Sequence, residues 1–236
     1  MASLPQPSSI NHMNKPILQY TDLITVPVQD NGEPLLEVNS LLPDVLYEYQ
    51  KQDMIPYVGN RFFLREGAIE RLRLASIALK KNRPDWRFKL VYAYRHPEIQ
   101  ARYFETRRSE IRAANPNLTD NEIRDRAHLL SASPGVAGHP TGGAIDVTIV
   151  DEIGAELDMG TAIADFTRGE KIQALFPYLT TEQKENRLFL RKLLMEQGFA
   201  PFDGEWWHFS YGDREWAKYY EQKCAVYDQV ASCNLS

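Results

Sequence analysis

Apolar residues recur at helical spacing in some stretches of the chain and at strand spacing in others, and this pattern predicts its main elements. Helical spacing over 65–82 and over 180–198 indicates two helices, and Gly198 suits the C-terminal cap of the second. Alternation over 86–94 and a β-branched run over 144–150 indicate two strands. An aromatic stretch over 206–211 is expected to form a last core strand.

Proline and capping residues mark further boundaries. Pro97 suits the first turn of a long polar helix that reaches about Ala114. The sequence TDNE at 119–122 is a capping-box pattern that opens another helix, and a glycine-rich loop over 133–143 leads into the strand at 144–150. Because helices and strands mix without a strict βαβ rhythm, the expected fold class is α+β.

Length and composition favour one ordinary globular domain. The chain has 236 residues, of which 43% are hydrophobic and 25% charged. Residues 1–20 are rich in Pro, Ser and Asn and are expected to form an arm, which leaves 21–236 as a single domain. Two cysteines, Cys224 and Cys233, are too few for a disulfide framework and are interpreted as ordinary residues.

Charge and hydropathy limit the partners and the expected location. The net charge of −5 argues against nucleic acid or an anionic membrane surface as the main partner. No stretch approaches the ~20 apolar residues of a membrane span, and the first residues lack the features of a secretory signal. A cytoplasmic protein is therefore expected, with the periplasm and a homo-oligomer left open.

Candidate chemistry begins at the glycine-rich loop. His139 lies in the loop and Asp146 in the strand that follows, on the face opposite Ile145 and Val147. A buried carboxylate is costly unless it is paired or binds a metal. Taken alone, each residue is better explained without a metal: His139 as a loop histidine, and Asp146 as an aspartate that pairs with a Lys or Arg.

A second cluster, EWWHF at 205–209, changes this interpretation. His208 completes a set of two imidazoles and one carboxylate, which leaves a fourth zinc position for water, as in catalytic zinc sites. Glu205 is the available general base. On a regular strand residues 205 and 208 would face opposite sides, so they converge only if Glu205 lies on the turn after Gly204 or if the strand bulges.

These segments resemble the zinc peptidase family of the D-alanyl-D-alanine dipeptidases. GHPTGGAIDVTI is similar to its His-x₆-Asp motif and GEWWHF to its Glu-x-x-His motif. AYRHP, LDMGTAIADF and NRLFLRKLLMEQGF resemble further segments, in order over roughly 85–210. The resemblance implies a small central antiparallel sheet flanked by helices, as in the hedgehog and D,D-peptidase fold. It implies one Zn²⁺ per chain bound by His139, Asp146 and His208, with Glu205 as base and Arg95 as the cation that stabilises the oxyanion.

Three positions depart from the family pattern. Ala137 stands where a serine is common, and Tyr92 stands where the segment before Arg95 often has an aspartate. The aspartate that holds the substrate's amino terminus is matched by Ala164, with Asp165 one place later. Asp165 is therefore expected to bind the substrate ammonium after a one-residue shift, unless that contact is absent.

The resemblance implies a zinc-dependent dipeptidase that hydrolyses D-alanyl-D-alanine or a related small D-amino-acid dipeptide. It also implies that the protein has a role in cell-wall metabolism. A D,D-carboxypeptidase or peptidoglycan endopeptidase of the same fold is the alternative. A non-catalytic zinc-binding module of the hedgehog type is a third possibility, and the presence of both Glu205 and Arg95 argues against it.

Overall fold

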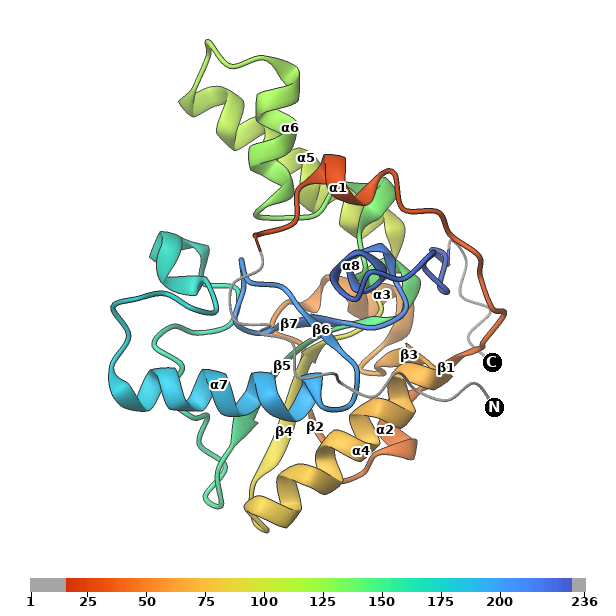
Figure 1. Ribbon diagram of the computed structural model, residues 1–236, viewed down its shortest axis with the longest axis vertical. Helices are drawn as coiled ribbons and strands as arrows, with labels where there is room; N and C mark the ends of the chain where they lie inside the picture. Colours follow the sequence, from red (N-terminus) through yellow and green to blue (C-terminus); the bar gives the residue numbers. More distant parts are fainter. Residues whose placement is uncertain (1–15, 231–236) are drawn as a thin grey trace.

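The structure is a computed structural model that describes residues 16–230. Its centre is a five-stranded sheet in the order β2-β4-β5-β7-β6 (Figure 1). The strands are β2 (Leu46–Tyr47), β4 (Arg87–Tyr92), β5 (Ala144–Val150), β7 (His208–Ser210) and β6 (Ala200–Pro201). The pairs from β4 to β6 are antiparallel, and the short edge strand β2 alone pairs in parallel, with β4. The predicted α+β fold with a small antiparallel sheet is confirmed.

A smaller two-stranded sheet and the helices surround this centre. The antiparallel strands β1 (Leu35–Glu37) and β3 (Phe63–Arg65) form the second sheet. The longer helices are α4 (Glu66–Asn82), α5 (Pro97–Ala114), α6 (Asp120–His128) and α7 (Thr181–Met195). The shorter α-helices are α1 (Tyr20–Leu23), α2 (Val38–Leu41), α3 (Ile55–Val58) and α8 (Arg214–Tyr219). Within residues 16–230, four 3₁₀ segments complete the set: η1 (Gln52–Met54), η2 (Pro134–Val136), η3 (His139–Thr141) and η4 (Phe166–Ile172).

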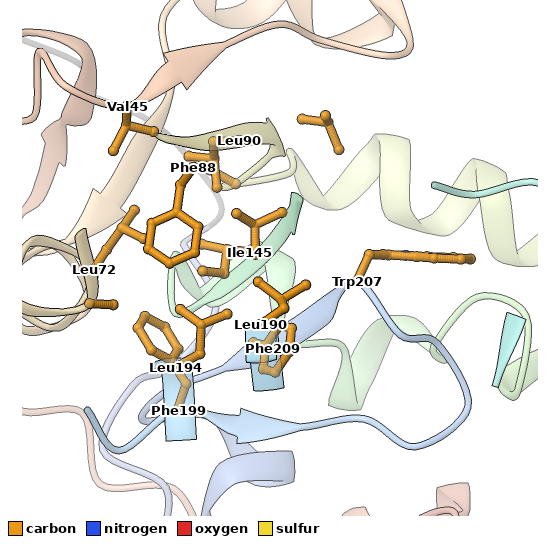
Figure 2. Close-up of a cluster of buried hydrophobic side chains, with 14 of the residues drawn as sticks. Val45, Leu72, Phe88, Leu90, Ile145, Leu190, Leu194, Phe199, Trp207 and Phe209 are labelled. Atoms are coloured by element: carbon orange, nitrogen blue, oxygen red, sulfur yellow. The ribbon is translucent and has the colours of Figure 1, made fainter. Parts of the chain in front are cut away.

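The main core lies between the sheet and the helices α4 and α7. These helices pack on each other and cover one face of the sheet, whereas α5 and α6 extend away from it together (Figure 1). Ile145 of β5 meets Leu72 of α4 and Leu190 and Leu194 of α7 in one buried cluster (Figure 2). Every residue of β5 is buried, so the central strand is held from both faces. A strand enclosed in this way is a rigid support for Asp146.

The expected elements agree closely with the structure. The predicted helices at 65–82 and 180–198 correspond to α4 and α7, and the strand at 144–150 has the bounds of β5. Gly198 has a φ of +88° and closes the end of α7, because this left-handed turn lets the Phe199 N–H donate to the Leu194 carbonyl over 3.2 Å.

The first sixty residues were the least predictable part of the chain. None of the short elements between residues 20 and 65 was expected from the apolar pattern. Most of the predicted arm, residues 1–15, lies outside the described residues, and Tyr20 already begins α1. The single-domain assignment stays a prediction. No helix within residues 16–230 has the length and apolar character needed to cross a membrane.

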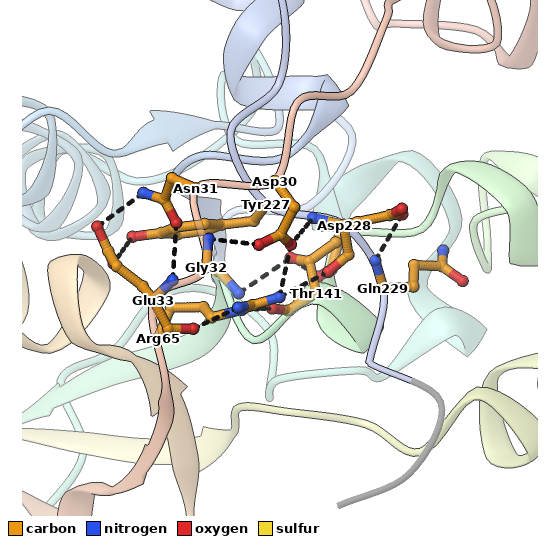
Figure 3. A network of polar contacts seen from close by, with 11 residues as sticks. Asp30, Asn31, Gly32, Glu33, Arg65, Thr141, Tyr227, Asp228 and Gln229 are labelled. Carbon is orange, nitrogen blue, oxygen red and sulfur yellow. Dashed lines mark hydrogen bonds and ion pairs between the residues drawn. The ribbon is translucent and has the colours of Figure 1, made fainter.

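Arg65, at the end of β3, ties three distant segments together (Figure 3). It is only 6% exposed. Its guanidinium donates to the carbonyls of Thr141 and Asp228 over 2.9 and 3.1 Å, to the Asp30 carboxylate over 2.8 Å, and also to the Glu33 carbonyl. Asp30 belongs to the N-terminal part of the chain, Asp228 to the C-terminal part and Thr141 to η3. The network therefore fixes the loop that carries His139.

Cys224 is a free, half-buried thiol whose Sγ lies 3.6 Å from Gln29 Oε1. Cys233 lies outside the described residues.

Candidate active site

The predicted ligands come together on three adjacent pieces of the fold. Asp146 lies in the central strand β5, where it pairs directly with His208 of β7 on one side and with Tyr92 of β4 on the other. His139 begins η3, in the loop that leads into β5. The antiparallel register thus brings residues 62 positions apart into contact across one strand pair.

His139 is oriented by a backbone carbonyl. Its Nδ1 lies 2.7 Å from the Ala93 carbonyl, so Nδ1 carries the hydrogen and Nε2 is left as the acceptor atom. This Nε2 lies 3.3 Å from Asp146 Oδ2. Gly142 closes the turn after His139 with a φ of +75°, and a Cβ there would lie 2.3 Å from Leu35 Cδ1. Only glycine fits this turn without displacing its neighbours.

His208 is oriented by a carboxylate from α8. Its Nδ1 lies 3.0 Å from Asp146 Oδ1, and its Nε2 lies 3.7 Å from Glu215 Oε2. The two histidines therefore offer different ring nitrogens, Nε2 of His139 and Nδ1 of His208, to the two carboxylate oxygens of Asp146. A metal-binding histidine commonly directs its second nitrogen to a carbonyl or a carboxylate, and both arrangements are present here.

The charges of the cluster follow from burial and from these contacts. Burial raises the pKa of Asp146, but the two imidazoles outweigh burial and hold this pKa well below its usual range. Burial lowers the pKa of His139 to about 4, which leaves this imidazole neutral. Burial acts in the same direction on His208, but Asp146 and Glu215 outweigh it and raise the pKa of His208. Binding of a metal ion to His208 must therefore release a proton.

These three residues fit a metal ion. One donor atom from each of His139, Asp146 and His208 lies within 4.8 Å of the other two. Two imidazoles and one carboxylate form a common protein donor set of a catalytic zinc ion. The second nitrogen of each histidine is already engaged elsewhere, so the donor atoms are oriented before any ion binds.

Glu205 lies in a turn rather than on the strand. Its backbone N–H donates to the Phe202 carbonyl over 3.1 Å, and its own carbonyl accepts from the His208 N–H over 3.3 Å. This turn resolves the conflict with strand alternation, because Glu205 precedes β7 and is free to face the same cavity as His208. Burial, opposed by His208 and supported by Asp146, raises the pKa of Glu205 to about 8.

Arg95 lies just beyond β4, close to Asp146. Its Nη2 is 3.9 Å from Asp146 Oδ2, and its Nη1 donates to Gln100 Oε1 over 2.8 Å. The guanidinium carbon lies 4.2 Å from the ring centre of Tyr92 and 5.1 Å from that of Tyr103. Its Nε is buried and has no hydrogen-bond partner among the described residues. The side chain is thus held in place while part of its donor capacity remains unused.

A cavity of about 330 Å³ lies in front of the cluster. Glu205, Arg95 and all three predicted ligands line it. Its volume is at the lower end of the ~300–1,000 Å³ that is typical of small-molecule sites.

Asp165 is the one predicted site residue that does not line this cavity. Its neighbours Ala164 and Phe166 do. The Asp165 carboxylate accepts hydrogen bonds from Thr167 Oγ1 over 2.5 Å and from Arg168 Nε over 3.1 Å. These bonds, led by the one from Thr167, lower the pKa of Asp165. Its substrate-binding role stays a prediction, and the geometry does not bring it to the site.

The two tryptophans between Glu205 and His208 belong to the main core. Trp206 is 3% exposed and Trp207 1%, and their ring centres lie 5.5 Å apart at 86°. Trp206 Nε1 donates to Thr161 Oγ1 over 2.9 Å, which satisfies its one polar atom. The pair anchors the turn that carries Glu205 and the strand that carries His208.

Glu215 and Gln100 were not identified from the sequence. Glu215 lies in α8, a six-residue helix whose apolar pattern is too short to be recognised, and it carries no motif. Gln100 lies on α5, where it is 1% exposed and bonds to Arg95. Only the folding of these helices onto the sheet brings either residue to the site.

The fold and the candidate site together fit a metal-dependent hydrolase. Residues 50–229 match the family model described as D-ala-D-ala dipeptidase. A D-alanyl-D-alanine dipeptidase from Synechocystis sp. is 30% identical over 239 aligned positions, which cover 88% of this chain and 94% of that protein. The chain belongs to this dipeptidase family, and it is accordingly a metallopeptidase.

More limited similarities were also found. A D-alanyl-D-alanine dipeptidase from Escherichia coli is 37% identical over 73 residues, 31% of this chain and 37% of that protein. The structure of the LD-carboxypeptidase LdcB aligns with a TM-score of 0.44 at 18% identity, covering 83% of this chain and 78% of that one. The structure of VanYB in complex with D-alanine-D-alanine aligns with a TM-score of 0.44 at 18% identity. The alignment covers 76% of this chain and 93% of that one.

Proposed function

We propose that the chain is a zinc-dependent peptidase that hydrolyses the peptide bond of D-alanyl-D-alanine or of a related small D-amino-acid dipeptide. The convergence of His139, Asp146 and His208 beside a cavity that also contains Glu205 and Arg95 carries this proposal. One Zn²⁺ per chain would be held by the two histidines and the aspartate. Membership of the dipeptidase family supports the substrate class.

The division of labour follows from the position of each side chain. When bound, zinc acts as a Lewis acid that polarises the scissile carbonyl and acidifies the attacking water. Glu205 is the general base: its carboxylate faces the cavity and has neither a hydrogen bond nor an ion pair to the described residues. The positive charge of a bound zinc ion would lower the pKa of Glu205 below its metal-free value of about 8, and the ionised carboxylate would then take a proton from the attacking water and deliver it to the leaving amine.

Arg95 stabilises the negative charge that develops on the carbonyl oxygen. Gln100 and the rings of Tyr92 and Tyr103 fix its guanidinium before the substrate binds. A fixed charge of this kind needs no reorganisation during the reaction, which is the physical basis of oxyanion stabilisation.

The test separates the ligands from the base. Wild-type protein is expected to contain about one zinc per chain and to release D-alanine from D-Ala-D-Ala but not L-alanine from L-Ala-L-Ala. His208→Ala should lose most of the zinc, because an incomplete ligand set binds it weakly. Glu205→Gln should retain the zinc and lose at least ~10²-fold in turnover. Full zinc in His208→Ala, or near-normal turnover in Glu205→Gln, would contradict the assignment.

A role in cell-wall metabolism is consistent with this substrate. The cytoplasmic location and a homo-oligomeric state stay predictions.

A further inference from the structure

Arg95 lies against two aromatic rings that come from different elements. Its guanidinium carbon is 4.2 Å from the ring centre of Tyr92, the last residue of β4, and 5.1 Å from that of Tyr103 on α5. Gln100 binds one edge of the guanidinium, and the Gln100 side-chain amide donates in turn to the Ala132 carbonyl over 2.7 Å. The positions of the two rings therefore limit how far the guanidinium can move.

One carboxylate accepts hydrogen bonds from both tyrosine hydroxyls. Asp53 lies in η1, and its Oδ1 accepts from the Tyr92 hydroxyl over 3.0 Å. Its Oδ2 accepts from the Tyr103 hydroxyl. The Asp53 side chain is 16% exposed. Burial, opposed by Arg95 and supported by Asp53, raises the pKa of Tyr92, so this hydroxyl keeps its proton and can donate.

Asp53 lies behind the two rings as seen from the cavity. Tyr92, Tyr103 and Arg95 line the cavity, and Asp53 does not. Its carboxylate also forms a 3.7 Å ion pair with Arg102, whose side chain is 59% exposed, so water screens that pair. An anion that accepts from a phenol hydroxyl increases the electron density of the ring, and the ring then attracts a guanidinium over its face more strongly.

We propose that Asp53 is a positioning residue for Arg95: it holds the rings of Tyr92 and Tyr103 against the guanidinium and so fixes the cation that stabilises the oxyanion. The inference rests on the proposed function and adds to it a residue outside the cavity. An arginine side chain is long and flexible, so restricting it before the substrate binds removes a cost that the transition state would otherwise carry. Loss of this restriction should therefore appear in kcat rather than in KM.

The first variant removes the charge of the carboxylate and keeps its shape. Asp53→Asn places an amide group against one of the two hydroxyls. In zinc-loaded full-length protein, kcat for D-Ala-D-Ala should fall about tenfold, whereas KM and the zinc content should stay within about twofold. Asp44→Asn is the matched control, because Asp44 is 66% exposed at its side chain and pairs with Lys80 at the surface. A wild-type kcat in Asp53→Asn would overturn the inference.

A second, milder variant separates the tyrosine contacts from the ion pair with Arg102. Tyr103→Phe removes one hydroxyl, keeps the ring and leaves the Asp53–Arg102 pair in place. It should lower kcat about threefold, since one of the two hydrogen bonds to Asp53 is lost. A wild-type kcat in Tyr103→Phe, together with a loss in Asp53→Asn, would assign the effect to the ion pair and overturn the inference.

A double-mutant cycle with Arg95→Lys tests whether Asp53 acts through Arg95. A lysine ammonium lacks the planar shape that stacks on the rings, so the contribution of Asp53 should largely disappear in that background. Asp53→Asn should then lower kcat less than about twofold when Arg95 is already lysine. A general structural role predicts instead the same tenfold loss in both backgrounds, with a lower urea midpoint. That result would overturn the inference.

Binding of a transition-state analogue gives a measurement that does not depend on turnover. A phosphinate analogue of D-Ala-D-Ala, in which a tetrahedral phosphorus replaces the scissile carbonyl carbon, should bind Asp53→Asn about tenfold more weakly than Asp44→Asn in calorimetric titrations. Equal affinity would overturn the inference and leave the zinc peptidase assignment intact. A wild-type kcat in Arg95→Lys would contradict the proposed role of Arg95, and the inference with it.

Discussion

Glu215 is expected to control the zinc affinity of the proposed site through its contact with His208. Replacement by glutamine keeps the shape of the side chain and removes its negative charge. His208 Nε2 lies 3.7 Å from Glu215 Oε2, and both side chains are nearly buried, with 11% and 12% exposure. The negative charge of Glu215 makes the His208 imidazole a more basic ligand. The nitrogen that would bind the metal ion is Nδ1, which lies beside Asp146.

The distance sets the size of the effect. Loss of a partner that hydrogen-bonds to a metal-binding histidine typically costs 10–100-fold in metal affinity. The 3.7 Å contact is longer than a hydrogen bond of 2.7–3.2 Å, so its contribution is mainly electrostatic. We therefore expect the lower end of the range for Glu215→Gln, about a tenfold increase in the zinc dissociation constant, or roughly 1.4 kcal/mol.

Stability should not fall in parallel. Burial, with the nearby Glu215 as a second cause, raises the pKa of Asp213 to about 6. Glu215 Oε1 and Asp213 Oδ2 are both buried without a hydrogen-bond partner among the described residues. Removing the charge at position 215 relieves this repulsion but also weakens the attraction to His208, so the metal-free variant should unfold near the same urea concentration as wild type.

The assay is competition for zinc with a chromophoric chelator at pH 7, with Glu196→Gln as the matched control. Glu196 is an exposed residue after α7 that forms only a 3.9 Å pair with Lys192. A dissociation constant for Glu215→Gln within twofold of the control, in protein of unchanged stability, would refute the argument. A tenfold loss in both variants would show that net charge rather than the contact with His208 is responsible.

Three further predictions concern the scaffold. Arg65→Met leaves the Asp30 carboxylate and several backbone carbonyls without their hydrogen-bond donor. It should lower the free energy of unfolding, measured by urea titration, by about 3 kcal/mol. A loss below about 1 kcal/mol would show that the network is dispensable. Leu194→Ala, at a fully buried position, should lower the free energy of unfolding by about 2–5 kcal/mol. Ile77→Ala, at a 54% exposed position, should lower it much less. Equal losses of unfolding free energy in the two variants would contradict the core described here. Burial raises the pKa of Asp30, but hydrogen bonds from backbone N–H groups and the charge of Arg65 outweigh burial and lower it. The ionised Asp30 carboxylate therefore contributes to the stability of the folded protein above the unfolded pKa, near 4. This contribution is lost as the pH falls through the lower folded pKa. Asp30→Asn should thus destabilise the protein at pH 7 and reduce the acid-induced loss of stability, and an unchanged pH profile would contradict this.

The sequence by itself determined the strongly patterned elements and supplied the candidate site residues. The strand at 144–150, the helices at 65–82 and 97–114 and the aromatic stretch that holds Trp206 and Trp207 follow from apolar spacing and local caps, which act over a few residues. The candidate ligand set was recognisable because two histidines and a carboxylate together match a catalytic zinc donor set, and because these segments resemble a known family.

The tertiary structure decided the relations between distant segments. Strand alternation alone places Glu205 and His208 on opposite faces, and only the turn from Phe202 to His208 brings both to the cavity. Glu215 and Asp53 carry no local signal, because their importance comes from the groups that α8 and the 50–54 segment bring near them. Asp165 was expected at the site from its sequence position, but the backbone at Ala164 turns it towards Arg168. Sequence spacing reports which face of an element a residue occupies, whereas the charges around it depend on packing between elements that are far apart in the chain.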